Sequence, residues 1–235
     1  WCFSGLLITL FATCNRSCEG GVISVANSSF ESPPLSDGAY TTSAASGTVP
    51  SWTINTSGKV VGVWNPQGLY YNNATGDGTP SGADGTNVAF FYGTSEGSLT
   101  QTLTESLAAN TNYTLTVAVG NRNVPELFAG YQIELLAGGV SVAIDSNATA
   151  PSAVGAFADV TLNFVTAGTH SQLGQTLGIR LTGPSSGSNT RVEYDNVRLT
   201  ATAATVPELS TAIPMGLLGI VGFTGRRRRR RSATV

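Results

Sequence analysis

The sequence has little charge, and the charge that it has is unevenly placed. Aspartate, glutamate, lysine and arginine make up 11% of the 235 residues, against about a quarter in typical soluble proteins. Six of the twelve basic residues form one run, Arg226 to Arg231, so residues 21–205 hold five basic and twelve acidic side chains. An acidic body disfavours nucleic acid as a partner and suits cations. Low charge with abundant Gly, Ser, Thr and Asn is typical of an exported β-protein.

Cysteine and histidine are almost missing, which excludes several kinds of active site. The three cysteines, Cys2, Cys14 and Cys18, all precede residue 21, so we expect no disulfide in the body of the chain. His170 is the only histidine and has no nucleophile motif beside it, which favours a surface turn residue over a catalytic base. Zinc would need a His or Cys cluster, and no Gly-rich loop opens a helix for phosphate. Carboxylates, carbonyl oxygens and aromatic rings remain as candidates.

Both ends of the sequence have the composition of targeting signals, and we exclude them from the fold. Residues 1–21 contain the apolar run Phe3 to Thr13, which is of signal-peptide length and too short to cross a membrane. Residues 205–235 contain Val206 to Thr211, an apolar segment and the arginine run. This tail resembles the PEP-CTERM sorting signal of bacterial envelope proteins, with Leu209 where a second proline is usual. We therefore expect export to the periplasm or cell envelope, with transient membrane association through the tail.

Residues 22–204 are predicted to form one all-β domain. Short runs of β-branched and aromatic residues alternate with Gly, Asn, Asp, Pro and Ser clusters, and no convincing amphipathic helix is present. This pattern predicts a β-sandwich of the jelly-roll kind. Gly138-Gly139 predicts a tight hairpin. The predicted strands are Val22–Ala26, Ser51–Asn55, Val60–Trp64, Val88–Tyr92, Ser98–Thr104, Asn112–Val119, Gly130–Leu136, Val140–Ile144, Ala156–Phe164, Thr176–Leu181 and Arg191–Thr200.

The last predicted strand alternates charged and apolar residues at period two, as a half-buried strand does. This alternation predicts that Val192, Tyr194 and Asn196 share one face, and it assigns a second set of residues to the other face. That second set is Glu193, Asp195, Val197 and Leu199. A carboxylate among core-facing residues is costly without partners. Asp195 should therefore be hydrogen-bonded, bound to a metal, or poised with a raised pKa.

Two short motifs at opposite ends of the domain favour calcium. Asn27-Ser28-Ser29-Phe30-Glu31 follows the first predicted strand, and Tyr194-Asp195-Asn196-Val197 lies in the last. The pair resembles carbohydrate-binding modules with galactose-binding-like jelly rolls, in which such motifs hold a structural Ca²⁺. The resemblance implies Glu31 and Asp195 as ligands, with backbone carbonyls near Asn27. Oxygen ligands of this kind suit Ca²⁺, although a hydrogen-bonded strand aspartate would fit the same pattern.

A more specific resemblance covers nearly all of the domain. The chain resembles the Stig cyclases of hapalindole-type indole alkaloid biosynthesis. The residues that carry this resemblance are Pro50–Ile54, Val63–Pro66, Asn87–Gly93, Val119–Arg122, Glu126–Phe128 and Tyr194–Val197. The resemblance implies a calcium-dependent enzyme that converts a geranylated isonitrile indolenine to hapalindole- or fischerindole-type alkaloids. The implied steps are a Cope rearrangement, cyclisation and electrophilic aromatic substitution, in a homo-oligomer or in a hetero-oligomer with related cyclases.

The same resemblance implies roles for four residues. Asp195 would be the acid that protonates or hydrogen-bonds the indolenine nitrogen, and Tyr92, Phe128 and Trp64 would form the aromatic wall. Ordinary core packing is the alternative for each aromatic residue. One carboxylate cannot easily be both calcium ligand and proton donor, so a calcium-bound Asp195 would require another acid near Tyr92. A non-catalytic, calcium-stabilised carbohydrate-binding envelope protein remains the alternative function.

Overall fold

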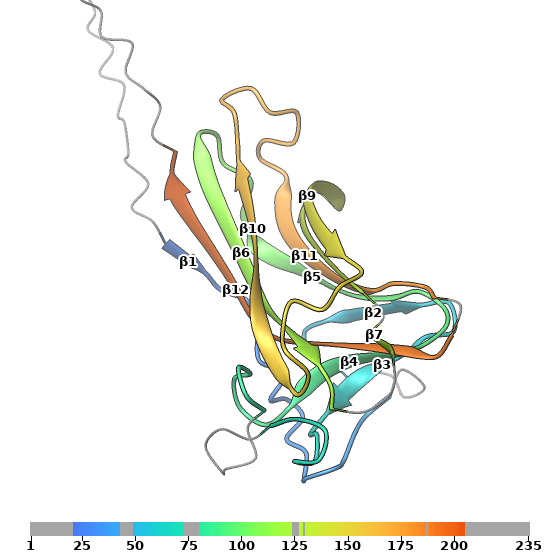
Figure 1. Ribbon diagram of the computed structural model, residues 1–235. Helices are drawn as coiled ribbons and strands as arrows, with labels where there is room; N and C mark the ends of the chain where they lie inside the picture. Colours follow the sequence, from blue (N-terminus) through green and yellow to red (C-terminus); the bar gives the residue numbers. More distant parts are fainter. Residues whose placement is uncertain are drawn as a thin grey trace, which may run out of the picture. The chain divides into compact units, whose positions relative to one another are not determined.

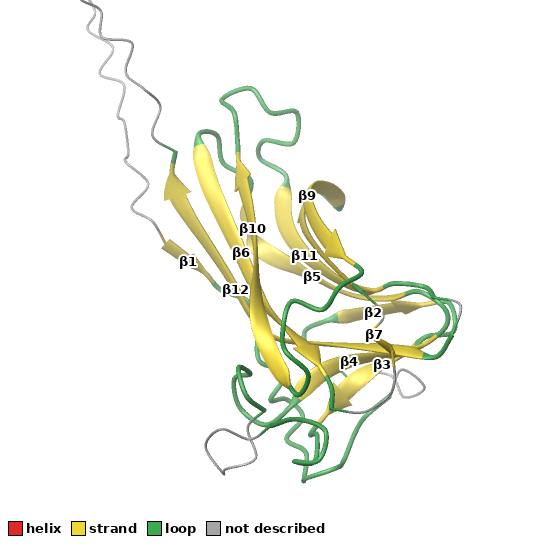
Figure 2. Cartoon of the chain, viewed as in Figure 1, coloured by secondary structure: helices red, strands yellow, loops and turns green. Residues whose placement is uncertain are grey.

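The computed structural model describes residues 21–42, 49–72, 80–123, 127–128, 130–186 and 188–204. The predicted signal peptide and the predicted sorting tail lie outside these residues, apart from Gly21 at the end of the former. Strands and turns make up the described chain, and no helix in it is long and apolar enough to cross a membrane. Figure 2 shows this all-β architecture. The predicted fold class is confirmed.

Two antiparallel sheets face each other and form a jelly roll (Figure 1). The larger sheet has the order β10-β6-β12-β4-β3, and β1 and β7 also pair with β12. The smaller sheet has the order β2-β5-β11-β8-β9. The strands are β1 (Gly21–Ile23), β2 (Thr53–Thr56), β3 (Val60–Trp64), β4 (Val88–Gly93), β5 (Gly97–Ser106), β6 (Thr111–Asn121), β7 (Leu127–Phe128), β8 (Tyr131–Ala137), β9 (Val140–Asn147), β10 (Ala156–Val165), β11 (Thr176–Gly183) and β12 (Thr190–Ala203).

All eleven predicted strands are present, with bounds that differ by a few residues, and β7 is the strand that the sequence pattern missed. β7 has two residues and pairs in parallel with the start of β12, so it is too short to show a period. The predicted hairpin is confirmed, because Gly138 and Gly139 join β8 to β9 with φ values of 59° and 78°. Positive φ at both positions is the requirement that favours glycine there.

One apolar core fills the space between the sheets. Strand β6 alternates buried and half-buried residues along most of its length, as expected for a strand with one face on the core. Val117 of β6, Ile179 of β11 and Val192 of β12 are fully buried in the same cluster. A second, smaller apolar cluster lies apart from this core and consists of Trp64, Tyr71, Val88, Phe90, Ala118 and Phe157.

Strand β12 contains a β-bulge that corrects the predicted distribution of its side chains. Asn196 has a φ of 47°, and the pairing of β12 with β6 shifts between Asp195 and Arg198. An extra residue in one strand inverts the alternation beyond it. Val197 and Leu199 therefore lie in the main core with Val192 and Tyr194. The prediction that they share a face with Glu193 and Asp195 is wrong.

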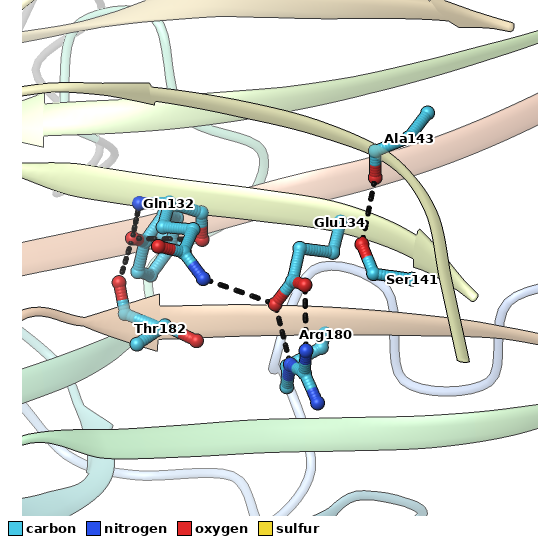
Figure 3. Close-up of polar contacts among 7 residues, drawn as sticks. Gln132, Glu134, Ser141, Ala143, Arg180 and Thr182 are labelled. Carbon is cyan, nitrogen blue, oxygen red and sulfur yellow. Dashed lines mark hydrogen bonds and ion pairs between the residues drawn. The ribbon is translucent and has the colours of Figure 1, made fainter. Parts of the chain in front are cut away.

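The outer face of the smaller sheet carries an ion pair between facing residues of two strands, in which the carboxylate is buried and the arginine is half-buried. Glu134 of β8 stands opposite Arg180 of β11 and accepts hydrogen bonds from its Nε and, at 2.5 Å, from its Nη2 (Figure 3). Gln132 Nε2 donates to the same carboxylate at 3.1 Å. Burial alone would raise the pKa of Glu134, but these hydrogen bonds outweigh it and lower the pKa. The pair therefore ties β8 to β11.

Tyr194 links the two sheets through its buried hydroxyl group. The hydroxyl donates to the carbonyl of Thr182 at 2.5 Å and accepts from the backbone N–H of Gln132 at 3.1 Å. Tyr194 belongs to the larger sheet, whereas Gln132 and Thr182 belong to the smaller sheet. The ring of Tyr194 also meets Phe91 edge-on at 5.4 Å between centroids. This residue fixes the central strand of one sheet against the other.

We expect Tyr194→Phe to lower the free energy of unfolding by about 1–3 kcal/mol, because two buried polar groups lose their partner. Urea unfolding measures the change. Tyr40→Phe is the matched control, since Tyr40 is 63% exposed and exposed substitutions usually cost less than about 0.5 kcal/mol. Equal stability of the two variants would contradict the role assigned to Tyr194.

Candidate functional site

A cleft of about 510 Å³ lies over β3, β4 and β12, and five of its eleven described lining residues are aromatic. The pairing register explains the wall, because Val60 faces Tyr92 across β3 and β4, and Tyr92 faces Arg191 across β4 and β12. Side chains two residues apart share a face, so Trp64 and Phe90 join the same surface. The lining residues are Gly38, Tyr40, Thr42, Val60, Trp64, Gln67, Tyr70, Phe90, Tyr92, Arg122 and Arg191.

Gly62 allows a loop segment to lie across β3 and complete the cleft. A Cβ atom at this position would stand 2.0 Å from the carbonyl oxygen of Thr41, which leaves room for glycine only. Thr41 N donates to the carbonyl of Val63 at 2.8 Å. This close approach places Tyr40 and Thr42 at the rim of the cleft.

Two arginines stack on the aromatic wall. The Cζ atom of Arg191 lies 4.3 Å from the Trp64 ring centroid and 4.7 Å from that of Phe90. The Cζ atom of Arg122 lies 5.0 Å from the centroid of Trp64 and 4.4 Å from that of Tyr70. Each distance is within the range of a cation–π contact. The wall is therefore a ladder in which guanidinium groups alternate with aromatic rings.

Glu193 is the acidic partner of the two arginines that stack on the aromatic wall. Its carboxylate is 1% exposed and accepts a hydrogen bond from Arg191 Nε, and Arg122 Nε lies 4.0 Å from the same oxygen. Tyr71 lies close by, and burial first, then the charge of Glu193, raise the pKa of its phenol. Sequence reasoning missed Glu193 as a site residue. The spacing Arg191-x-Glu193 on one strand face was the available signal, because residues two apart in a strand can pair.

A second polar site lies around Asp195, which is fully buried. Its Oδ2 accepts a hydrogen bond from the backbone N–H of Asp84 at 2.6 Å, and its Oδ1 has no hydrogen-bond partner within the described residues. Burial raises the pKa of Asp195 well above its usual value, and the charges of Asp84 and Glu31 add to this effect. The side chain is therefore disfavoured as an anion unless a cation approaches.

A shallow hollow of about 320 Å³ is lined in part by Asp84, the residue whose backbone N–H donates to Asp195. Asn27, Ser28, Ser29, Glu31, Asp84 and Gly85 line it. Glu31 Oε1 accepts from the backbone N–H of Asn87 at 2.7 Å, and Ser29 Oγ donates to Asp84 at 2.7 Å. Gly85 has a φ of 79°, and a Cβ there would lie 2.4 Å from Glu31. The hollow thus joins the loop after β1 to the loop before β4.

The structure separates the predicted site residues into two groups. Trp64 and Tyr92, two of the residues predicted for an aromatic wall, both line the cleft. Phe128 of β7 packs against the main core and is absent from the cleft lining. Asp195 does not line the cleft either, and its contacts are with Asp84. Asp195 is therefore linked through Asp84 to the hollow that Asn27 and Glu31 line, although Asp195 is not itself among the lining residues of that hollow.

Asn27 and Glu31 both line the hollow near Asp195, but the side chain of Asn27 is already engaged. Asn27 Nδ2 donates to the carbonyls of Ser32 and Pro50 at 2.9 and 3.1 Å, and its Oδ1 accepts from Ser32 N at 3.0 Å. It therefore shapes the loop. Within the described chain, no group of three or more His, Cys, Asp or Glu side chains is arranged to hold a metal.

Comparisons with known proteins point to one family. The family model described as HpiC1-like, HpiC1 cyclase, matches residues 21–200. The crystal structure of an apo-form cyclase from Fischerella sp. is 33% identical, with a TM-score of 0.68 over 81% of this chain and 100% of that chain. No curated protein matches the chain.

Two further solved structures contain indole compounds. The Stig cyclase Fisc from Fischerella sp. TAU, in complex with (3Z)-3-(1-methyl-2-pyrrolidinylidene)-3H-indole, is 32% identical with a TM-score of 0.67, over 79% of this chain and 100% of that chain. A cyclase from Fischerella sp. TAU in complex with 4-(1H-indol-3-yl)butan-2-one is 32% identical with a TM-score of 0.62, over 79% and 100%.

We expect Glu193→Gln to lower the free energy of unfolding by about 3 kcal/mol, because two guanidinium groups lose a buried carboxylate. The double variant Glu193→Gln/Arg191→Gln should recover part of this loss. Urea unfolding of the wild type, the two single variants and the double variant measures the interaction energy between the two side chains. Asp159→Asn breaks an exposed ion pair with Arg198 and should cost less than about 1 kcal/mol. If Glu193→Gln lowers the free energy of unfolding no more than Asp159→Asn does, the proposed pairing of Glu193 with the two arginines is wrong.

Proposed function

The chain belongs to the HpiC1-like family of Stig cyclases, and from this premise we propose that its aromatic cleft cyclises an indole with an attached terpenoid chain. The observation that carries the proposal is that Trp64, Tyr70, Phe90 and Tyr92 together line a cleft of about 510 Å³. Small-molecule sites are commonly apolar clefts of about 300–1,000 Å³. The indole compounds bound to two similar cyclases support the indole part of the substrate.

The reaction sequence that we propose is a Cope rearrangement, a cyclisation and an electrophilic aromatic substitution. The resemblance to the Stig cyclases implies these steps, with a geranylated isonitrile indolenine as the parent substrate. A Cope rearrangement breaks one carbon–carbon σ bond and forms another, so the product is an isomer of the substrate. The cleft must mainly fold the terpenoid chain over the indole, because bringing the reacting carbons together supplies much of the rate.

A ring face attracts a cation, but the rings of Trp64, Tyr70 and Phe90 already contact the guanidinium groups of Arg122 or Arg191. Tyr92, which also lines the cleft, is therefore the ring that we propose for the positive charge that develops during cyclisation. Asp195 does not line the cleft, so direct proton donation from it to a bound indolenine has no support in its position. Hydrogen-bond donors that do line the cleft include the guanidinium of Arg191 and the phenol of Tyr92.

Calcium is proposed for the second site rather than for the cleft. The buried, unpartnered Oδ1 of Asp195 and the carboxylates of Glu31 and Asp84 supply hard oxygen donors, the type that Ca²⁺ binds. Glu31 and Asp195, the two ligands that the resemblance implies, would hold the ion, with Asp84 and backbone carbonyls of residues 27–31 as further candidates. The described carboxylates would have to move closer together to bind it, because no three of them form a metal-binding group in the structure. Calcium would supply positive charge that compensates the buried anion of Asp195. The loops after β1 and before β4 would then stay joined to β12.

Turnover is tested by incubating the purified protein with geranylated indolenines that carry either an isonitrile or a carboxylate as their polar group. We expect polycyclic products with the mass of the substrate, detected by chromatography with mass spectrometry. Trp64→Ala should reduce their yield about tenfold or more, since the loss of a packed aromatic wall removes about 1–3 kcal/mol of positioning. Ile144→Ala, at an exposed position on the other sheet, is the control and should leave the yield unchanged.

An absence of isomeric products from both substrates would contradict the proposed cyclase. Retention of the same protein on a polysaccharide column would then favour the carbohydrate-binding alternative. Equal yields from Trp64→Ala and the control would instead locate the reaction outside the aromatic cleft.

Calcium binding is tested by the melting temperature with Ca²⁺ and with chelator. Calcium at about 100 times its Kd should add about 2.7 kcal/mol, a rise in Tm of roughly 5–10 °C for a domain of this size. Asp195→Asn keeps an oxygen that accepts the Asp84 N–H but removes the negative charge, so its Tm should not rise with calcium. Asp159→Asn changes an exposed carboxylate, and its Tm should rise with calcium as that of the wild type does. An equal rise in Asp195→Asn would contradict the site.

The raised pKa of Asp195 sets the pH dependence of the calcium effect. The carboxyl group of Asp195 binds its proton more tightly in the folded chain than in the unfolded chain. In chelator, the contribution of Asp195 to stability therefore falls as pH rises from the unfolded pKa of about 3.9 through the higher folded pKa. We expect the calcium-induced rise in Tm to be larger at pH 7 than at pH 4, where protons compete with the ion. A rise that is independent of pH would contradict Asp195 as a ligand.

A further inference from the structure

The charged side chains that line the aromatic cleft are all basic. Among the described lining residues, Arg122 and Arg191 carry charge, and the remainder are aromatic, aliphatic or neutral polar. Glu193 is 1% exposed and lies behind Arg191 rather than in the lining. A ligand that enters the cleft therefore meets a guanidinium group first and the carboxylate only through it.

Arg191 is held in one orientation with its donor end still available. Its guanidinium lies between the rings of Trp64 and Phe90, and its Nε donates to Glu193. Within the described residues its two terminal nitrogens make no hydrogen bond, and the side chain is 15% exposed. A guanidinium has five N–H donors in a planar fork, so four remain on the terminal nitrogens. Because the rings and Glu193 fix the plane, little side-chain entropy remains to be lost on binding.

We propose that the cleft is selective for indole substrates that carry an anionic group, with a carboxylate received by the terminal nitrogens of Arg191. The two oxygens of a carboxylate match the guanidinium fork and form paired, charge-assisted hydrogen bonds. An isonitrile offers a single uncharged acceptor atom to the same fork. An ammonium group would be repelled by Arg191. The preference for an indole rests on the proposed cyclase function, whereas the preference for an anionic group rests on the position of Arg191.

Structural packing is the competing explanation for Arg191. An arginine kept only to stack on Trp64 and Phe90 would stabilise the fold equally with any ligand or none. It would then give no preference for the charge of a ligand. The preference among ligands of one shape, and its dependence on Arg191, therefore separates the two explanations.

Three indoles of one shape provide the test. 4-(1H-Indol-3-yl)butan-2-one is the ketone that a similar cyclase binds, 3-(1H-indol-3-yl)propanoate replaces its methyl group by a carboxylate oxygen, and 4-(1H-indol-3-yl)butan-2-amine replaces its carbonyl by an ammonium group. Titration calorimetry on the purified protein at pH 7.5 measures each Kd. We expect the acid to bind about tenfold to a hundredfold more tightly than the ketone, and the amine to bind more weakly than the ketone.

Variants of Arg191 assign this preference to one side chain. Arg191→Gln should weaken binding of the acid far more than binding of the ketone, so that the Kd of the acid comes within about threefold of that of the ketone. Arg198→Gln is the matched control, because Arg198 is on the same strand, is 45% exposed and pairs with Asp159. It should retain the full preference. If Arg191→Gln does not fold, Arg191→Met/Glu193→Gln removes the ion pair as a unit and must also lose the preference.

Each other outcome overturns the proposal. Equal affinity for the acid and the ketone would show that the cleft does not select an anion, while the indole function would stand. A preference that survives in the Arg191 variants would place the anion site elsewhere. Failure of all three indoles to bind would contradict the cyclase function itself, and the proposed selectivity would fall with it.

Discussion

Two carboxylates buried on the same face of one central strand constrain the rest of the structure. Glu193 and Asp195 are almost inaccessible to solvent on β12, and each must be compensated, because an unpaired buried charge destabilises a fold by several kcal/mol. Arg191 and the nearby Arg122 compensate Glu193, and this requirement brings the guanidinium ladder to the cleft. Asp195 requires the backbone of the loop before β4. The inner face of β12 serves the core, so both proposed sites lie on its outer face.

The two buried carboxylates have different partners, and this bears on the two roles that the sequence suggested for Asp195. The sequence suggested Asp195 both as a calcium ligand and as an acid, roles that require opposite protonation behaviour. In the structure Asp195 contacts Asp84, while Glu193, two residues earlier on the same strand, supports the cleft through Arg191. The proposed ion site and the proposed reaction site are thus neighbours along β12 that share no lining residue.

Local periodicity explains how much of the fold could be predicted. All strands except β7 were predicted, and so was the Gly138-Gly139 hairpin. The roles suggested for Trp64 and Tyr92 came from family resemblance and stay predictions. The bulge at Asn196 was not predicted, because asparagine with positive φ has no period-two signature. Glu193 was missed because its importance arises from Arg122, which is 71 residues away in the sequence. Such pairings depend on strand register, which a single sequence leaves undetermined.

The guanidinium ladder also makes Trp64 an intrinsic optical reporter. Trp52 packs against Phe30 in the main core, so Trp64 is the one tryptophan of the described chain that lines the cleft. Its indole ring contacts both arginines, and a nearby cation alters the emission of an indole that it stacks upon. A ligand that draws Arg191 away from this ring would change that environment directly. The residue that forms the wall therefore also signals, through its fluorescence, whether the cleft is filled.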